Sequence, residues 1–233
     1  MQLDNFEFRR VRAGIETLPG SFSLPRHRHF QAYATVVLAG KFEESGYDGR
    51  VLATAGDVLI HPTLDCHANR MISAGVKLIR LHWNNGSAPG GLYWLDNIDD
   101  LARTAEKDLR EAAALLASSL SENRRLSPGL KNDWPDLLLK ALIGADFPEI
   151  GDWAESNGLA RETVSRGFAS AYGISPVAFR AEFRARAAWL RIAYGSDPLS
   201  QIAAETGFSD QAHMTRWIRR ITGAPPSVWR RNY

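Results

Sequence analysis

The chain has 233 residues, of which 45% are hydrophobic and 23% charged, and its net charge is +2. This composition is typical of a soluble globular protein with one or two cores. It argues against a membrane span, because no run of about eighteen apolar residues occurs, and no secretory signal is expected. The single cysteine, Cys66, excludes an internal disulfide, and we therefore expect a cytoplasmic protein.

Residues 1–95 are predicted to form a domain of short β-strands. The segments Ala32–Ala39 and Val76–Trp83 are apolar on both faces, as buried strands are, and glycine or proline separates them from their neighbours. Short strands at this spacing favour a sandwich or a barrel. A loop rich in asparagine, glycine and proline, at residues 84–91, closes this part of the chain.

Residues 96–146 are predicted to be helical and to link this domain to the rest of the chain. Apolar residues three to five positions apart form one stripe. The stripe suits a helix packed on its own β domain, or a helix that meets the same helix of a second copy in a homodimer, and both alternatives stay open. A further helix is expected around Trp134–Ile143. The stripe consists of Ile98, Leu101, Ala105, Leu109, Ala112, Leu116 and Leu120.

Residues 147–233 are predicted to form an all-α domain with a basic surface. Residues 151–233 hold 11 arginines, no lysine and 7 acidic residues, a net charge of +4, whereas residues 1–150 carry a net charge of −2. A basic excess favours a polyanionic partner. A long helix is expected at about Pro176–Tyr194, and Asp197 followed by Pro198 predicts the N-cap and first turn of the next helix.

Two similar units lie in this last region. When Gly158 is aligned with Gly207, Ala154 falls on Ala203, and an apolar residue follows six or seven positions after each glycine. This is the spacing of a helix-turn-helix, in which a small residue lets two helices cross and a glycine supplies the left-handed turn. The spacing occurs twice, with the glycines 49 positions apart, which makes the prediction specific.

The second helix of each unit is predicted to have one buried and one exposed face. We expect the buried face of the first to carry Val164, Phe168 and Ala171, and that of the second to carry Met214, Trp217, Ile218 and Ile221. An exposed face that carries arginine, glutamine and threonine suits the major groove of DNA, although a solvated helix is the alternative. The predicted DNA contacts are Arg161, Glu162, Thr163, Ser165, Arg166, Gln211, Ala212, His213, Thr215 and Arg216.

The segment from about 150 to 231 resembles the DNA-binding domain of the AraC/XylS family of bacterial transcription regulators. Gly207–Gln211, Thr215–Arg216 and Pro225–Pro226 carry the resemblance in the second unit, and Gly173–Pro176 carries it in the first. The resemblance implies that a long helix joins the two units. It also implies that both second helices enter the major groove on one face of DNA, roughly 34 Å apart. Gly167, inside the first of them, is expected to cost up to about 1 kcal/mol of helix stability.

Five of the six histidines lie in the predicted β domain. The stretches RHRHFQAYATVVLAG and GDVLIHPTLDCHAN resemble the two sequence blocks of cupin barrels, but the family's glutamate is missing near Tyr33 and its glycine after Pro62 is absent. The histidines could line a pocket, contact an effector directly or hold a metal with an open site. The predicted effector pocket consists of His27, His29, Tyr33, His67 and His82, and a metal would fall on His27, His29 and His67.

These features predict an α+β chain. An N-terminal cupin-like β-barrel with flanking helices precedes a C-terminal all-α domain, in which a long helix joins two helix-turn-helix units. The resemblance implies a sequence-specific DNA-binding transcription regulator that is not an enzyme and is controlled by a small molecule in the barrel. We expect double-stranded promoter DNA as a partner, RNA polymerase as well if the protein is an activator, and no cofactor. The alternatives are a cupin metalloenzyme with an accessory helical domain, and a regulator that responds to a protein partner.

Overall fold

The structure is a computed structural model that describes residues 10–84, 89–121, 133–144 and 149–232. The chain divides into two compact units, Met1–Asp136 and Leu137–Tyr233, and helix α3 (Trp134–Ile143) crosses the boundary. Residues 96–146 therefore do not form a separate third unit. Of the predicted loop at 84–91, residues 85–88 lie outside the described residues.

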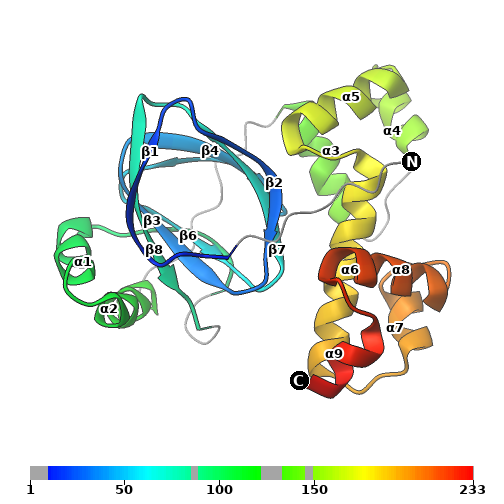
Figure 1. Cartoon of the computed structure of the whole chain (residues 1–233). Helices are drawn as coiled ribbons and strands as arrows, with labels where there is room; N and C mark the ends of the chain where they lie inside the picture. Colours follow the sequence, from blue (N-terminus) through cyan, green and yellow to red (C-terminus); the bar gives the residue numbers. More distant parts are fainter. Residues whose placement is uncertain (1–9, 85–88, 122–132, 145–148, 233) are drawn as a thin grey trace. The chain divides into compact units, whose positions relative to one another are not determined.

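The first unit contains two antiparallel sheets (Figure 1). In the described residues, the strands are β1 (Gly14–Pro19), β2 (Ser23–His29), β3 (Tyr33–Ala39), β4 (Lys41–Gly46), β5 (Gly49–Thr54), β6 (Asp57–His61), β7 (Asp65–Met71), β8 (Gly75–His82) and β9 (Gly91–Trp94). The five-stranded sheet has the order β1-β8-β3-β6-β9, and the four-stranded sheet has the order β2-β7-β4-β5. The described strands thus form two separate sheets rather than one closed barrel.

Two helices, α1 (Ile98–Ala105) and α2 (Leu109–Ser121), pack on the five-stranded sheet. The predicted stripe is interrupted between them, because the Asp108 carboxylate accepts the N–H groups of Arg110 and Glu111 at 2.7 and 3.2 Å and caps a new helix. The stripe is buried against residues of the chain's own sheet, which confirms the first of the two alternatives. A homodimer stays a prediction, and this stripe no longer supports it.

An apolar core lies between the two sheets of the first unit. It is built by side chains that alternate along the strands, because successive residues of a strand point to opposite faces. Phe42, Met71 and Leu78 belong to this core and also border the polar cavity described below. The core consists of Val37, Phe42, Val51, Ala53, Leu59, Met71, Val76, Leu78 and Leu92.

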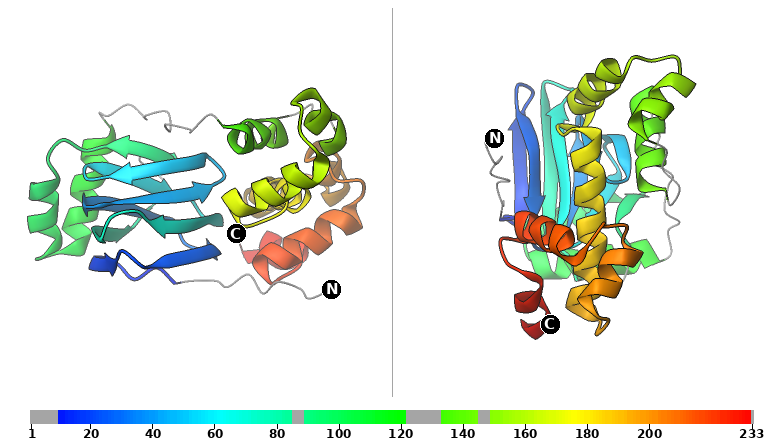
Figure 2. Two further views of the ribbon diagram at one scale, coloured as in Figure 1. Left: turned by 90° about the horizontal axis from the view of Figure 1, so that it is seen from above. Right: turned by 90° about the vertical axis from the view of Figure 1, so that its right-hand side faces the viewer.

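The second unit consists of two helix pairs joined by one long helix (Figure 2). The long helix is predicted correctly, and it packs against helices of both pairs. Phe179 meets Phe168 near its start, and Trp189 meets Trp229 near its end. No helix in the described residues is long and apolar enough to cross a membrane. The helices are α4 (Ile150–Ser156), α5 (Arg161–Tyr172), α6 (Pro176–Tyr194), α7 (Leu199–Glu205), α8 (Gln211–Thr222) and α9 (Pro226–Asn232).

The packing of α2 on the sheet predicts different costs for two adjacent leucines. Leu116 is fully buried, whereas Leu115 is 37% exposed. Leu116→Ala is expected to lower the free energy of unfolding by about 2–5 kcal/mol, because it leaves a cavity. Leu115→Ala, the matched control, should cost less than about 1 kcal/mol. Urea denaturation, monitored by hydrogen exchange of the strand amides, measures the free energy of unfolding of both variants. Equal losses of stability in the two variants would contradict the packing.

Candidate functional site

The same backbone turn joins α4 to α5 in the first helix pair and α7 to α8 in the second. Gly158 has a φ of 66° and Gly207 a φ of 75°, in the left-handed region that a side chain opposes. In both turns, the residue after the glycine donates its N–H to the carbonyl of Ala154 or Ala203, at 2.9 Å. The two predicted helix-turn-helix units therefore share their backbone geometry as well as their sequence spacing.

The second helices of the two pairs, α5 and α8, also correspond. Each has 12 residues and ends at a left-handed glycine, Gly173 with φ 71° or Gly223 with φ 77°. Val164 and Phe168 are fully buried in α5, as predicted, whereas Ala171 is partly exposed and the neighbouring Tyr172 is fully buried instead. In α8, Met214, Ile218 and Ile221 are fully buried, also as predicted.

Trp217 was predicted to be buried in α8, and this is wrong. It lies at the edge of the apolar stripe, is partly exposed, and carries the guanidinium of Arg220 4.9 Å from its ring centroid. The last turn buries Thr222 instead, whose hydroxyl donates to the Ile218 carbonyl at 2.7 Å and accepts the indole N–H of Trp229 at 2.8 Å. The buried stripe thus continues at positions 214, 218, 221 and 222, with the helical period.

All ten predicted DNA contacts lie on surfaces that solvent reaches. Ser165, His213 and Thr215 are partly exposed, and the other seven are exposed. His213 is held close to the turn, because its Nδ1 is 3.1 Å from the Ser209 hydroxyl and its ring meets Phe208 edge-on. The exposed residues are Arg161, Glu162, Thr163, Arg166, Gln211, Ala212 and Arg216.

The first turn of α8 is fixed more firmly than that of α5. The Asp210 carboxylate accepts the N–H of His213 at 2.6 Å, and this backbone hydrogen bond is the main reason why the pKa of Asp210 is lowered. The corresponding N-cap of α5 is Ala160, which has no side chain that could accept such a bond. The N-terminus of α8 is therefore capped by a side chain, whereas that of α5 is not.

Arginines of α6 tie the second helix pair to the long helix. Arg184 donates to the Gly207 carbonyl at 2.7 Å, and Arg191 binds Asp197 at 2.6 Å and pairs with Glu205. The prediction of Asp197 as the N-cap of α7 is wrong, because its carboxylate is engaged by Arg191 and Pro198 occupies the N-cap position. These contacts hold α7 and the turn at Gly207 against α6.

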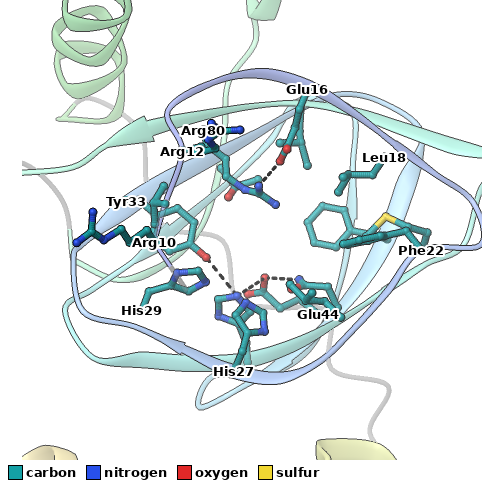
Figure 3. Close-up of a pocket in the computed structure, with 18 residues that line it drawn as sticks. Arg10, Arg12, Glu16, Leu18, Phe22, His27, His29, Tyr33, Glu44 and Arg80 are labelled. Atoms are coloured by element: carbon teal, nitrogen blue, oxygen red, sulfur yellow. Dashed lines mark hydrogen bonds and ion pairs between the residues drawn. The ribbon is translucent and has the colours of Figure 1, made fainter. Parts of the chain in front are cut away.

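The first unit contains a cavity of about 300 Å³ between its two sheets (Figure 3). Its lining follows the period of two along six strands, which points every second side chain inward. The residues before β1 complete the lining with Arg10, Val11 and Arg12. The strands contribute Glu16, Leu18, Leu24, His27, His29, Tyr33, Thr35, Phe42, Glu44, His67, Asn69, Met71, Leu78 and Arg80, and Phe22 lies just before β2.

Four of the five predicted pocket residues line this cavity, namely His27, His29, Tyr33 and His67. His82 does not line it. It is the last residue of β8, is exposed, and borders a separate hollow beside α2. The cavity's three arginines and Glu44 were not predicted from the sequence, because neither a motif nor the cupin resemblance marks them.

Three histidines of the cavity lie close together. The ring centroids of His27 and His67, which face each other across β2 and β7, are 4.6 Å apart, and those of His27 and His29 are 4.7 Å apart. One ring nitrogen of each lies within 4.8 Å of the others. His27 Nδ1 is 2.9 Å from the Pro25 carbonyl, so it donates there and leaves Nε2 as an acceptor. After small side-chain shifts, this donor set fits a divalent ion that prefers imidazole.

Asp65 links this cluster to a second one. Its Oδ2 accepts hydrogen bonds from His61 Nδ1 at 2.9 Å and from His67 Nδ1 at 3.1 Å. Burial raises the pKa of Asp65, but the two hydrogen bonds outweigh this effect and hold it well below its usual range. Burial lowers the pKa of His67 well below its usual value, so His67 is neutral and its Nε2 accepts the Tyr33 hydroxyl at 3.2 Å.

Glu44 supplies a carboxylate to the same cavity from β4. With His61 and His67 it forms a second group of possible metal ligands, whose ligand atoms lie within 4.8 Å of one another. Burial raises the pKa of Glu44, and Asn69 donates to its carboxylate at 2.8 Å. The pKa of His61 is lowered by burial, but the charges of Glu44 and Asp65 and a hydrogen bond to Asp65 raise it overall. The carboxylate that the cupin resemblance lacks near Tyr33 is thus present on another strand.

The turn before Asp65 is strained. Leu64 has a φ of 58°, in the left-handed region that only glycine adopts freely, and it follows the place where the cupin glycine is absent. Leu64 is fully buried, and its carbonyl accepts a hydrogen bond of 3.0 Å from the buried Arg28. Arg28 also donates to the Tyr47 hydroxyl at 3.2 Å. These bonds hold the turn that presents Asp65 to the histidines.

Comparisons with known proteins identify the second unit. Residues 153–232 match the family described as "Helix-turn-helix domain". No curated protein matches the chain.

Three solved structures resemble the chain at low similarity. ToxT from Vibrio cholerae with bound unsaturated fatty acid shares 11% identity over 94% of each chain, with a TM-score of 0.38. The DNA-binding domain of AdpA, described as a global transcriptional factor and solved with a target DNA, shares 22% identity over 41% of this chain and 84% of that chain, with a TM-score of 0.35. Salicylate 1,2-dioxygenase from Pseudoaminobacter salicylatoxidans shares 26% identity over 29% of this chain and 21% of that chain, with a TM-score of 0.28. Scores this low do not establish a common overall fold.

The network around Asp65 predicts opposite titrations for two neighbouring histidines. As the pH falls through about 6.5, the value for an unperturbed imidazole, His67 should stay neutral with its proton on Nδ1. His61 should stay protonated above that pH. Nitrogen-15 NMR of labelled histidine measures both, and it would contradict the network if His67 titrated above His61.

The same shifts set the pH dependence of stability. Because the pKa of His67 is lower in the folded state, its contribution is present above pH 6.5 or so and is lost as the pH falls toward the folded value. The contribution of Asp65 is present above about pH 3.9 and is lost as the pH falls toward its own lower value. Asp65→Asn is the control for both, because it removes the negative charge of the carboxylate that His61 and His67 share.

Proposed function

We propose that this chain is a sequence-specific DNA-binding transcription regulator of the AraC type, because its residues 153–232 match a helix-turn-helix domain family and carry the motifs of the AraC/XylS resemblance. One observation carries the proposal beyond that match. The chain builds the same left-handed glycine turn twice, at Gly158 and Gly207, and each turn is followed by a helix of 12 residues with an exposed polar face. Two reading helices in one unit suit two successive stretches of major groove.

In this proposal, Arg166 on α5 and Arg216 on α8 read base edges. Both are exposed, and both lie two residues after the first buried residue of their helix, Val164 or Met214. Arginine can donate to both O6 and N7 of guanine, which is the commonest specific contact in the major groove. Gln211, Thr215, Arg161 and Ser165 would make further contacts on the same faces.

The first unit is proposed to control this activity by binding a small molecule. The mixed polar and apolar lining of its cavity supports this role, because ligand sites combine apolar walls with a few placed polar groups. An effector changes DNA affinity only if it binds the two states of the protein differently. The proposed partners are double-stranded promoter DNA in the cytoplasm, RNA polymerase if the protein is an activator, and a second copy of the chain. No catalytic step is proposed.

A divalent metal in the cavity is a second proposal, supported by the grouping of His27, His29 and His67. These three residues would hold it, and Asp65 would orient His67 from behind, as carboxylates do for metal-binding histidines. Imidazole ligands favour zinc, copper, iron or nickel. When bound, such an ion supplies a positive site for an anionic ligand.

The proposed base contact predicts different effects for two arginines of α8. Arg216→Ala should cost about 1–3 kcal/mol of specific binding and relax the preference at one base position. Arg219→Ala, the matched control three residues further along the same exposed face, should weaken binding evenly across sequences and reduce its salt dependence. DNA selected from a random pool, followed by titration at several salt concentrations, measures both. If Arg216→Ala left the selected sequence and its affinity unchanged, the assignment would be wrong.

The proposed metal site predicts one ion for each chain. Elemental analysis of the purified protein and a titration with Co²⁺, followed by visible absorption, measure the stoichiometry and affinity. His29→Ala should weaken binding at least tenfold, as loss of a ligand does, whereas His82→Ala should have no effect, because His82 lies outside the cavity. A protein that neither carries nor takes up metal would leave the histidines as a polar lining only.

A further inference from the structure

The cavity carries an excess of positive charge on one side. Arg10, Arg12 and Arg80 line it together with two carboxylates, Glu16 and Glu44. Glu16 pairs with Arg80. Within the described part of the chain, no ion pair joins Arg10 or Arg12 to a carboxylate, and both side chains are exposed to solvent. The three arginines of the lining outnumber its two carboxylates, and Arg10 and Arg12 have no carboxylate partner in it.

Another side of the same cavity is apolar. Leu18 and Phe22 lie away from the arginines in Figure 3. Phe42, Met71 and Leu78 continue this wall and belong to the apolar core between the sheets. These side chains offer no strong hydrogen-bond partner to a ligand, so this wall suits a part of the ligand that carries no hydroxyl or charged groups.

The volume limits the size of the ligand. A cavity of about 300 Å³ has the space of roughly ten water molecules. This is at the small end of ligand pockets, and it admits one aromatic ring or a short alkyl chain with one polar group.

We propose that the cavity binds a small monocarboxylic acid, with its carboxylate held by Arg10 and Arg12 and its aromatic or aliphatic body against Leu18, Phe22 and Leu78. A guanidinium matches a carboxylate with two parallel hydrogen bonds, which fixes orientation as well as charge. One carboxylate supplies an anionic partner for these two arginines. This ligand deepens the proposed function, since its role as the effector rests on the chain being a regulator.

Other small ligands fit the lining less well. A sugar presents hydroxyl groups on every side, and those against Leu18, Phe22 and Leu78 would lose their hydrogen bonds to water without replacement. A phosphate monoester carries about two negative charges near neutral pH and would place more negative charge beside Glu16 and Glu44 than one carboxylate does. A neutral alcohol or amide leaves the two arginines without an anion.

Calorimetry on the full chain tests the proposal with matched pairs of probes. Phenylacetate and hexanoate should bind at least tenfold more tightly than phenylacetamide and 1-hexanol, which have the same bodies without the charge. Acetate, which has the charge without the body, should bind at least tenfold more weakly than hexanoate. If the neutral probes bound as well as the acids, or if neither acid bound at millimolar concentration, the proposal would be overturned.

Substitution of the arginines locates the carboxylate. Arg10→Gln and Arg12→Gln should each weaken phenylacetate binding at least tenfold. The matched control is Arg70→Gln, because Arg70 is exposed, pairs with Glu43 and does not line the cavity. Circular dichroism checks that all three variants fold. Unchanged affinity in the double variant of Arg10 and Arg12 would overturn the assignment of these residues.

The two proposals fail separately. Calorimetry needs no DNA, so acid binding without any selected DNA sequence would refute the regulator and retain the ligand site. DNA binding by a chain that ignores every acid would refute the ligand site and retain the regulator. If both hold, phenylacetate should shift the affinity for the selected DNA, and that DNA should shift the affinity for phenylacetate by the same factor.

Discussion

The direction of each reading helix depends on one short backbone turn, and the proposed DNA surface depends on that direction. In both helix pairs, a left-handed glycine reverses the chain, and a hydrogen bond to the carbonyl of Ala154 or Ala203 closes the turn. A side chain at Gly207 would also meet the guanidinium of Arg184, at 2.9 Å from its Cζ. The two helix pairs therefore share backbone geometry as well as sequence, because the same turn fixes the direction of α5 and of α8. The long helix α6 packs against helices of both pairs.

The first unit depends on a different constraint, which is the alternation of side chains along its strands. The same alternation that builds the apolar core also turns histidines, carboxylates and arginines inward. Such groups are costly to bury unless they are hydrogen-bonded or paired. Asp65 meets part of this cost, because its ionised carboxylate accepts from His61 and His67 together. Arg10 and Arg12 precede β1, border the cavity from a solvent-exposed position and have no carboxylate partner in its lining, and this is the basis for proposing an anionic ligand.

Local pattern predicted the strands, the long helix and both turns, because each follows from a period or from a glycine that few residues can replace. Tertiary competition explains the errors. Aspartate is a common N-cap residue, but the carboxylate of Asp197 instead accepts a hydrogen bond from Arg191, six residues earlier on α6. Asp108 divides a helix that its apolar stripe predicts to be continuous. The cavity was only partly predictable, since spacing brings His27 and His29 together, whereas Glu44 reaches the cluster through a strand pairing that no motif records.

The most direct test of the central claim, that two equivalent units read DNA together, is hydroxyl-radical footprinting on a selected DNA sequence. Two protected segments are expected on one face of the duplex, about 10 base pairs apart from centre to centre. Inserting five base pairs between the segments turns them to opposite faces, and this should weaken binding at least tenfold. A single protected segment, or an affinity that is indifferent to the insertion, would contradict the claim.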